Sequence, residues 1–236
     1  MNQRWNLLPA LVALLTATGA LTGCQTAQHS ASKPQSKASQ EAVAPAQALE
    51  RLKAGNDRFV AGRPLARNLP AERETTAAGQ YPYAVVLSCL DSRCSSELIF
   101  DQGLGDIFNA RVAGNVLNDD ILGSMEFACK SAGAKLIVVI GHSKCGAVKG
   151  ACTDVQLGNL TGLLAKIKPA AAAAPSSDAN HLTDAHVDAV AKENVKRVVA
   201  QIKERSPILA ELVQSGKVGL IGGMYDLKSG KVAFLE

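Results

Sequence analysis

Two short motifs in this chain combine residue types that bind soft metals with charged side chains. Cys89 is followed by Asp91 and Arg93, and His142 is followed three positions later by Cys145. Thiolate sulfur and imidazole nitrogen are common ligands of zinc, and a site with three protein ligands leaves a position for water or substrate. The two motifs therefore predict a catalytic zinc site with Cys89, His142 and Cys145 as ligands.

Each motif follows an apolar run that is typical of a buried strand. Residues 83–88 precede Cys89, and residues 136–140 precede His142. Runs that are apolar nearly throughout indicate strands of a parallel sheet that is covered on both faces. Because ligands bind at the carboxyl ends of strands in open α/β sheets, we expect the two motifs to meet at one sheet edge.

Predicted strands and helices alternate along the rest of the chain. Helical patterns run from Asn118 or Asp119 to Ala132 and from Asp184 to Arg205. The predicted strands are Tyr83–Ser88, Asp106–Arg111, Lys135–Gly141, Val218–Met224 and Val232–Leu235. This alternation, with short links, predicts an α/β fold with a mostly parallel sheet flanked by helices. Four strands would be parallel, and the C-terminal strand would form an antiparallel edge.

The motifs and their order resemble those of the β-class carbonic anhydrases. Cys89 to Arg93 reads C-x-D-S-R and His142 to Cys145 reads H-x-x-C, with Arg111–Asn115 between them as in that family. The likeness extends from about Ala48 to the C-terminus. It implies one Zn²⁺ per subunit, CO₂ and bicarbonate as substrate and product, and a homodimer or homotetramer.

The resemblance also implies roles for Asp91 and Arg93. Asp91 would accept a hydrogen bond from water at the metal, while Arg93 holds the carboxylate with a forked ion pair. In a closed, inactive state of the family, the same aspartate becomes a fourth metal ligand. The plain alternative is a surface salt bridge without a catalytic role.

Three further residues are candidates for substrate binding. Gln80 lies nine residues before Cys89, where family members with a constitutively open site carry a glutamine that hydrogen-bonds substrate. Phe108 and Ala113 are candidate walls of an apolar CO₂ pocket, although either fits ordinary core equally well. Cys94 stands where the family usually has valine, and it would bring an extra thiol close to the metal.

The N-terminal segment lies outside this likeness. Residues 7–20 form an apolar stretch too short to cross a bilayer comfortably, as in a secretory signal. The following Leu21-Thr22-Gly23-Cys24 resembles a bacterial lipobox, which implies cleavage before Cys24 and its lipidation. An ordinary signal, with Cys24 incidental, is the alternative. We expect a signal peptide at 1–23, a disordered tether at 24–47 and a carbonic anhydrase domain at 48–236. A lipid anchor on Cys24 would hold the protein on the periplasmic side of a bacterial membrane.

The composition argues against nucleic-acid binding. The chain of 236 residues has a formal net charge of only +4, its basic residues are scattered, and aromatic residues make up 4%. A nucleic-acid surface would need clustered charge and stacking side chains.

Two alternative functions stay open at this stage. Some proteins similar to this sequence hydrolyse carbon disulfide through a blocked tunnel, which a sequence does not reveal. A non-catalytic lipoprotein could instead use zinc only to hold its fold together, with four protein ligands and no need for Arg93. Taken singly, Cys89 and Cys145 could also be no more than buried small side chains.

Overall fold

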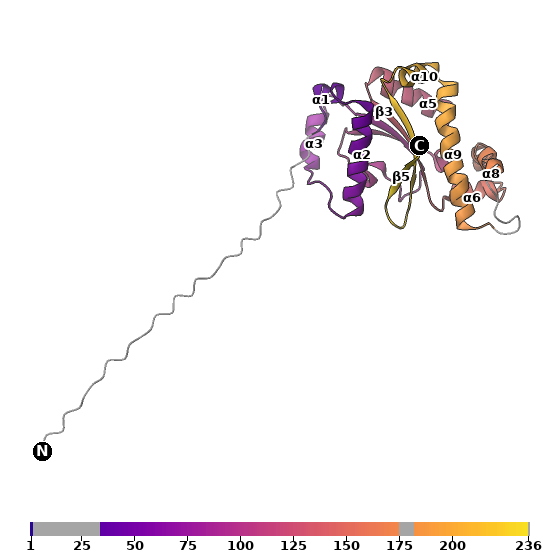
Figure 1. Ribbon diagram of the computed structural model, residues 1–236, viewed down its shortest axis with the longest axis horizontal. Helices are drawn as coiled ribbons and strands as arrows, with labels where there is room; N and C mark the ends of the chain where they lie inside the picture. Colours follow the sequence, from indigo (N-terminus) through magenta and orange to yellow (C-terminus); the bar gives the residue numbers. More distant parts are fainter. Residues whose placement is uncertain (2–33, 175–181, 236) are drawn as a thin grey trace.

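A five-stranded sheet forms the centre of the molecule (Figure 1). The computed structural model describes residue 1 and residues 34–174 and 182–235, so Cys24 and all of the predicted signal peptide except Met1 lie outside the described residues. The strands are β1 (Ala84–Ser88), β2 (Ile107–Arg111), β3 (Leu136–His142), β4 (Gly219–Tyr225) and β5 (Val232–Leu235).

The sheet has the strand order β2-β1-β3-β4-β5. The first four strands run parallel, and β5 pairs antiparallel with β4, which confirms the predicted sheet. The chain adds β2 on one side of β1 and then crosses over to add β3 on the other side. The strand order therefore reverses between β1 and β3, which is where open α/β sheets bind their ligands.

Helices cover both faces of the sheet, which explains why β1 and β3 are apolar throughout. Val85, Leu87, Ile137 and Val139 face one layer of helices. That layer consists of α5 (Asp119–Glu126), a π-helical turn (Phe127–Ser131), α9 (Asp184–Arg205) and α10 (Pro207–Gln214). Alternate strand residues face the opposite layer, which contains α2 (Pro45–Val60) and α4 (Ser96–Ile99). In Figure 1, α2 and α9 lie on different sides of the sheet.

The carboxyl edge of β1 and β3 is surrounded by short helices. These are a 3₁₀ turn (Ala113–Asn115), α6 (Gly146–Cys152), α7 (Gly158–Ala165) and α8 (Lys168–Ala173). Their apolar side chains pack with those of α9 around Cys89 and Cys145. Among the described helices, none has the length and apolar character needed to cross a membrane.

The folded domain begins before residue 48, so the predicted boundary is too late. Residues Lys37–Glu41 form α1, and the buried Gln40 donates hydrogen bonds from Nε2 to the carbonyl oxygens of Pro82 (2.7 Å) and Ala132 (2.8 Å). Val43 is also buried. One buried amide and one apolar side chain thus order a segment whose polar composition predicts a tether. The later part of the range 24–47 belongs to the domain.

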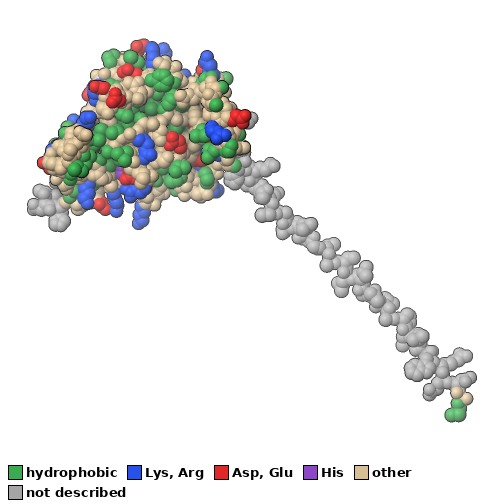
Figure 2. All heavy atoms as spheres, turned by 180° about the vertical axis from the view of Figure 1, so that it is seen from behind, with side chains coloured by type: hydrophobic (Ala, Val, Ile, Leu, Met, Phe, Trp, Pro, Cys, Tyr) green, Lys and Arg blue, Asp and Glu red, His purple; other side chains and the backbone are tan. Residues whose placement is uncertain are grey.

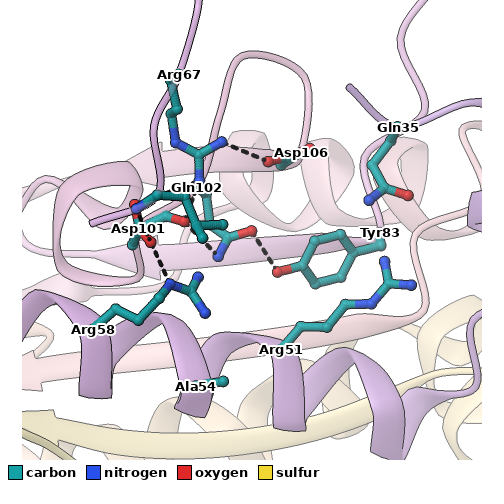
Figure 3. Close-up of a pocket in the computed structure, with 10 residues that line it drawn as sticks. Gln35, Arg51, Ala54, Arg58, Arg67, Tyr83, Asp101, Gln102 and Asp106 are labelled. Atoms are coloured by element: carbon teal, nitrogen blue, oxygen red, sulfur yellow. Dashed lines mark hydrogen bonds and ion pairs between the residues drawn. The ribbon is translucent and has the colours of Figure 1, made fainter. Parts of the chain in front are cut away.

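A polar pocket of about 330 Å³ lies at the opposite, amino-terminal edge of β1 (Figure 3). Arg58 Nε lies 2.5 Å from Asp101 Oδ2, and the Tyr83 hydroxyl donates to Gln102 Oε1 over 2.7 Å. The Arg51 guanidinium stacks over the Tyr83 ring, 5.3 Å from its centroid. These side chains bind one another and tie α2 to the loop before β2.

Candidate metal centre

Two thiols and one imidazole meet at the carboxyl edge of β1 and β3. Cys89 directly follows β1, His142 ends β3, and Cys145 is the N-cap of α6. The sulfur atoms of Cys89 and Cys145 are 4.0 Å apart, and one ligand atom from each of the three residues lies within 4.8 Å of the others. All three residues are buried. The strand positions thus bring the two motifs together, as the sequence predicts.

The imidazole of His142 fits a metal ligand. Its Nδ1 donates to the carbonyl oxygen of Ser143 over 2.9 Å, which fixes the tautomer and leaves a lone pair on Nε2. Nε2 is buried without a hydrogen-bond partner. Burying an unpaired polar atom is costly, and a bound metal ion removes that cost. Zinc–sulfur bonds of about 2.3 Å in tetrahedral geometry also suit the separation of the two sulfurs. The donor set therefore fits Zn²⁺.

The two thiols are not equivalent in the protein itself. The hydrogen bond with Cys145, with help from His142, lowers the pKa of Cys89 to about 4. The neighbouring Cys89 sulfur and burial raise the pKa of Cys145. The opposite directions of the two pKa shifts favour the thiolate on Cys89 and the thiol on Cys145, and a divalent cation held by both sulfurs would displace the remaining proton.

Arg93 holds the Asp91 carboxylate beside the three ligands. Its Nε donates to Asp91 Oδ1 over 2.9 Å, its Nη2 donates to Oδ2 over 2.7 Å, and its backbone N–H donates to Oδ1 over 3.0 Å. These hydrogen bonds hold the pKa of Asp91 well below its usual range. Asp91 Oδ2 lies 4.0 Å from His142 Nε2. The carboxylate thus faces the metal group but is bound by Arg93 instead of joining the ligands.

Backbone groups around the site have partners that the sequence motifs did not reveal. Arg111 Nε donates to the carbonyl oxygen of Cys89 (3.1 Å), and its Nη2 donates to that of Asp91 (2.5 Å). Gly114 N–H donates to Cys89 Sγ over 3.3 Å. Both residues belong to a run noted for its resemblance, but their contacts depend on the crossover that brings β2 beside β1.

Of the candidate substrate-binding residues, Ala113 lies beside the metal group and Phe108 lines a different pocket. Ala113 directly precedes Gly114 and so lies next to the Cys89 half of the site. Phe108 lies in β2, where its backbone pairs with Val85 of β1. Its ring packs edge-on against Phe127, with ring centroids 6.2 Å apart. It lines a different pocket, of about 710 Å³, with Ile121.

Gln80 does not lie near the metal ligands of its own chain. It is exposed and precedes β1, whereas Cys89 follows β1. Because a strand extends the chain by roughly 3.3 Å per residue, the two residues are at opposite ends of β1. A contact between Gln80 and the zinc site within one chain is therefore ruled out.

The extra thiol of Cys94 is part of the core. It is 1% exposed and packs with the apolar residues under α2 and α4. Burial raises the pKa of this thiol to about 12. Each of the five cysteines in the described part of the chain is free, and Cys94 is not in the three-residue metal group.

Known proteins are similar to this chain in sequence and in fold. The sequence pattern of the family described as carbonic anhydrase matches residues 84–232. Carbonic anhydrase 2 of Mycobacterium tuberculosis is 37% identical over 198 residues, which span 81% of this chain and 93% of that protein. The carbonic anhydrase of Pseudomonas aeruginosa is 33% identical over 174 residues, covering 69% of this chain and 77% of its own length.

Solved structures of β-carbonic anhydrases are also similar to this chain. The β-carbonic anhydrase CafA of Aspergillus fumigatus superposes with a TM-score of 0.63 at 27% identity, over 81% of this chain and 90% of that chain. A tetrameric β-carbonic anhydrase of Sordaria macrospora gives a TM-score of 0.62 at 25% identity, over 70% and 86% of the two chains. Sheet and metal group together define a zinc-binding α/β protein of the β class. The chain belongs to the carbonic anhydrase family.

Proposed function

We propose that this protein catalyses the reversible hydration of CO₂ to bicarbonate and a proton, with one zinc ion per chain. The observation that carries this function is the convergence of Cys89, His142 and Cys145 within 4.8 Å, with the Asp91 carboxylate held beside them. A zinc ion in such a site acts as a Lewis acid that activates water for attack on CO₂.

The side chains of the protein hold and orient the reactants. Asp91 Oδ2 faces the metal group, and an ionised carboxylate only accepts hydrogen bonds. The Asp91 carboxylate therefore favours a reactant whose protonated oxygen donates a hydrogen bond to it. Arg93 fixes the direction of this acceptor by its two-pronged contact, and a positioned acceptor lowers the barrier more than a mobile one.

The contact between Asp91 and Arg93 also favours a catalytic zinc site over a purely structural one. A structural zinc site normally has four protein ligands, and the Asp91 carboxylate, with Oδ2 4.0 Å from His142 Nε2, is placed beside the three ligands as a possible fourth. Both of its oxygens bind Arg93 instead. This arrangement favours a site in which the fourth position is left for a reactant.

The function is tested by stopped-flow measurement of CO₂ hydration with purified, zinc-loaded protein. Hydrolysis of CS₂ is measured on the same preparation, because both substrates suit this fold. We expect rapid CO₂ hydration that stops on zinc removal and returns when zinc is restored. Negligible hydration with rapid CS₂ hydrolysis would instead establish the alternative enzyme.

We also propose that the protein is a homodimer or homotetramer. Figure 2 shows a broad hydrophobic area with few charges on the face opposite to that of Figure 1. Large apolar side chains are widely exposed, among them Leu90 (60%), Leu98 (68%) and Phe127 (55%). The related Sordaria macrospora enzymes are described as tetrameric. Light scattering is expected to give two or four chains, and a monomer at micromolar concentration would refute this assembly.

We propose, finally, that Cys24 carries a lipid anchor that holds the protein on the periplasmic side of a bacterial membrane. The support is the sequence Leu21-Thr22-Gly23-Cys24 after an apolar segment. Mass spectrometry of protein extracted from bacterial membranes should find acyl groups on Cys24, and Cys24→Ser should move the protein to the soluble fraction. A parent protein that is cleaved elsewhere and lacks lipid would contradict the anchor.

A further inference from the structure

One helix contacts both halves of the metal centre. Near the start of α9, Asp188 Oδ1 accepts a hydrogen bond from the backbone N–H of Lys144 over 2.6 Å. Almost two turns later, Asn194 Nδ2 donates to the carbonyl oxygen of Gly114 over 2.9 Å. Lys144 lies between two metal ligands, and Gly114 contacts the third. We propose that Asp188 and Asn194 are positioning residues that hold the two halves of the zinc site from a single helix.

Asp188 acts on the turn between His142 and Cys145. Lys144 has φ of 54°, a left-handed conformation that is unfavourable for a residue with a long side chain such as lysine. The turn keeps this conformation with a hydrogen bond to a carboxylate, and such charge-assisted bonds are stronger than neutral ones. Asp188 therefore stabilises the conformation that sets the spacing of the two ligands.

Asn194 acts on the peptide that contacts Cys89. Its side chain is buried, with 2% of the residue exposed. Gly114 has φ of 65°, and an added Cβ would lie 2.5 Å from Ile167 Cδ1, so the backbone is packed closely there. The Asn194 amide fixes the Gly114 carbonyl, and the N–H of the same residue donates to Cys89 Sγ. Asn194 thus orients a donor to the metal-binding sulfur.

The rest of α9 keeps these two side chains in place. Val190, Val195 and Val198 of the helix are buried against the sheet and the neighbouring helices. The position of the helix therefore does not depend on the two polar contacts. Asp188 and Asn194 can act on the metal centre as fixed groups on a rigid element, which is what orients metal ligands well.

A second contact of α9 with Lys144 provides a matched control. Asp184 Oδ2 lies 2.9 Å from Lys144 Nζ, but both side chains are mostly exposed, at 66% and 64%. Exposed ion pairs contribute little, and this one holds only the end of the lysine side chain. Asp184 is therefore expected to have no effect on the metal ligands, although it binds the same residue as Asp188.

The proposal rests on zinc binding by the proposed site, and it is tested by zinc affinity rather than turnover. The zinc Kd is measured by competition with a chromogenic chelator. We expect Asp188→Ala to raise Kd by about 10–100-fold, the usual effect of removing a group that orients a ligand. Asp188→Asn keeps an acceptor oxygen and should stay within a few-fold of the parent. Asp184→Asn should match the parent.

The unfolding midpoint of the metal-free protein separates positioning from general stability. Asp188 is only half-buried, so Asp188→Ala should fold with an almost unchanged midpoint while its zinc Kd rises. Asn194→Ser, in the buried position, should raise Kd as well. The proposal is overturned if Asp188→Ala binds zinc as the parent does, or if Asp184→Asn weakens binding equally. A parent that binds zinc tightly without hydrating CO₂ would refute the proposed function and leave this inference standing.

Discussion

Arg93 is the residue that determines where the Asp91 carboxylate points. Three hydrogen bonds from Arg93 reach the two oxygens of Asp91, and Oδ2 lies 4.0 Å from His142 Nε2, one of the proposed metal-ligand atoms. Without Arg93, the carboxylate would be free to turn toward the three ligands. In the proposed function, this contact decides whether Asp91 accepts a hydrogen bond from a reactant or becomes a fourth ligand.

Replacing Arg93 tests this role directly. Arg93→Ala should lower the rate of CO₂ hydration by roughly 100-fold or more, as expected when a positioned proton acceptor is lost. The zinc content should remain at the level of the parent, because the three ligands are unchanged. Arg93→Lys keeps the charge without the fork and should give an intermediate rate. An Arg93→Ala enzyme with full turnover would refute the role of Arg93.

The pH dependence of stability offers a second test of the same pair. Arg93 lowers the pKa of Asp91 in the folded protein below the unfolded value of about 3.9. The pair therefore stabilises the fold above that value, and its contribution is lost as the pH falls through the folded pKa. The difference in unfolding free energy between the parent and Asp91→Asn should be constant from about pH 6 to 8 and shrink below about pH 4. Urea unfolding of the metal-free proteins measures this difference in unfolding free energy. A difference that grows as the pH falls would show that the ion pair does not stabilise the fold in this way.

At the scale of elements, the sheet was predictable and some connections were not. The observed strands lie within a residue or so of the predicted ones, because a sheet covered on both faces needs continuous apolar runs. The positions of these apolar runs also predicted that Cys89 and His142 lie together at the carboxyl edge of the sheet. They did not reveal α1, whose order depends on the single buried side chain of Gln40. Nor did they reveal Asn194, since a contact with Gly114 eighty residues earlier has no local sequence pattern.

The anchoring of α1 can be measured by one substitution. Gln40→Ala leaves the carbonyl oxygens of Pro82 and Ala132 without their partner, and we expect a loss of about 1–3 kcal/mol in unfolding free energy. Gln47→Ala is the matched control, because Gln47 is exposed and accepts one hydrogen bond from Ala44 N–H. The control should lose less than about 1 kcal/mol. Equal stability of Gln40→Ala and the parent would show that α1 is not anchored in this way.

At the scale of the whole molecule, the position of Gln80 links activity to assembly. Gln80 is exposed at the amino-terminal end of β1, away from the zinc ligands of its own chain. If this glutamine binds substrate, as the family resemblance implies, it does so in the site of another subunit. The sequence pattern contains the residue but cannot say to which chain it contributes.

Mixing two defective subunits tests this arrangement. Gln80→Ala and Arg93→Ala should each lower CO₂ hydration when assembled alone. A mixed assembly combines an intact Gln80 from one chain with an intact Arg93 in the other, so dissociation and reassociation of the two variants should restore part of the activity. Mixed assemblies no more active than the separate variants would show that Gln80 does not act across subunits.

The central claim is that Cys89, His142 and Cys145 hold a zinc ion while Asp91 stays with Arg93. Anomalous diffraction at the zinc edge, from crystals grown at mildly alkaline pH, tests it most directly. We predict a zinc peak about 2.3 Å from each of the two sulfur atoms and about 2.0 Å from His142 Nε2, with the Asp91 carboxylate still on Arg93. Zinc bound elsewhere, or held by Asp91 as a permanent fourth ligand, would contradict the account.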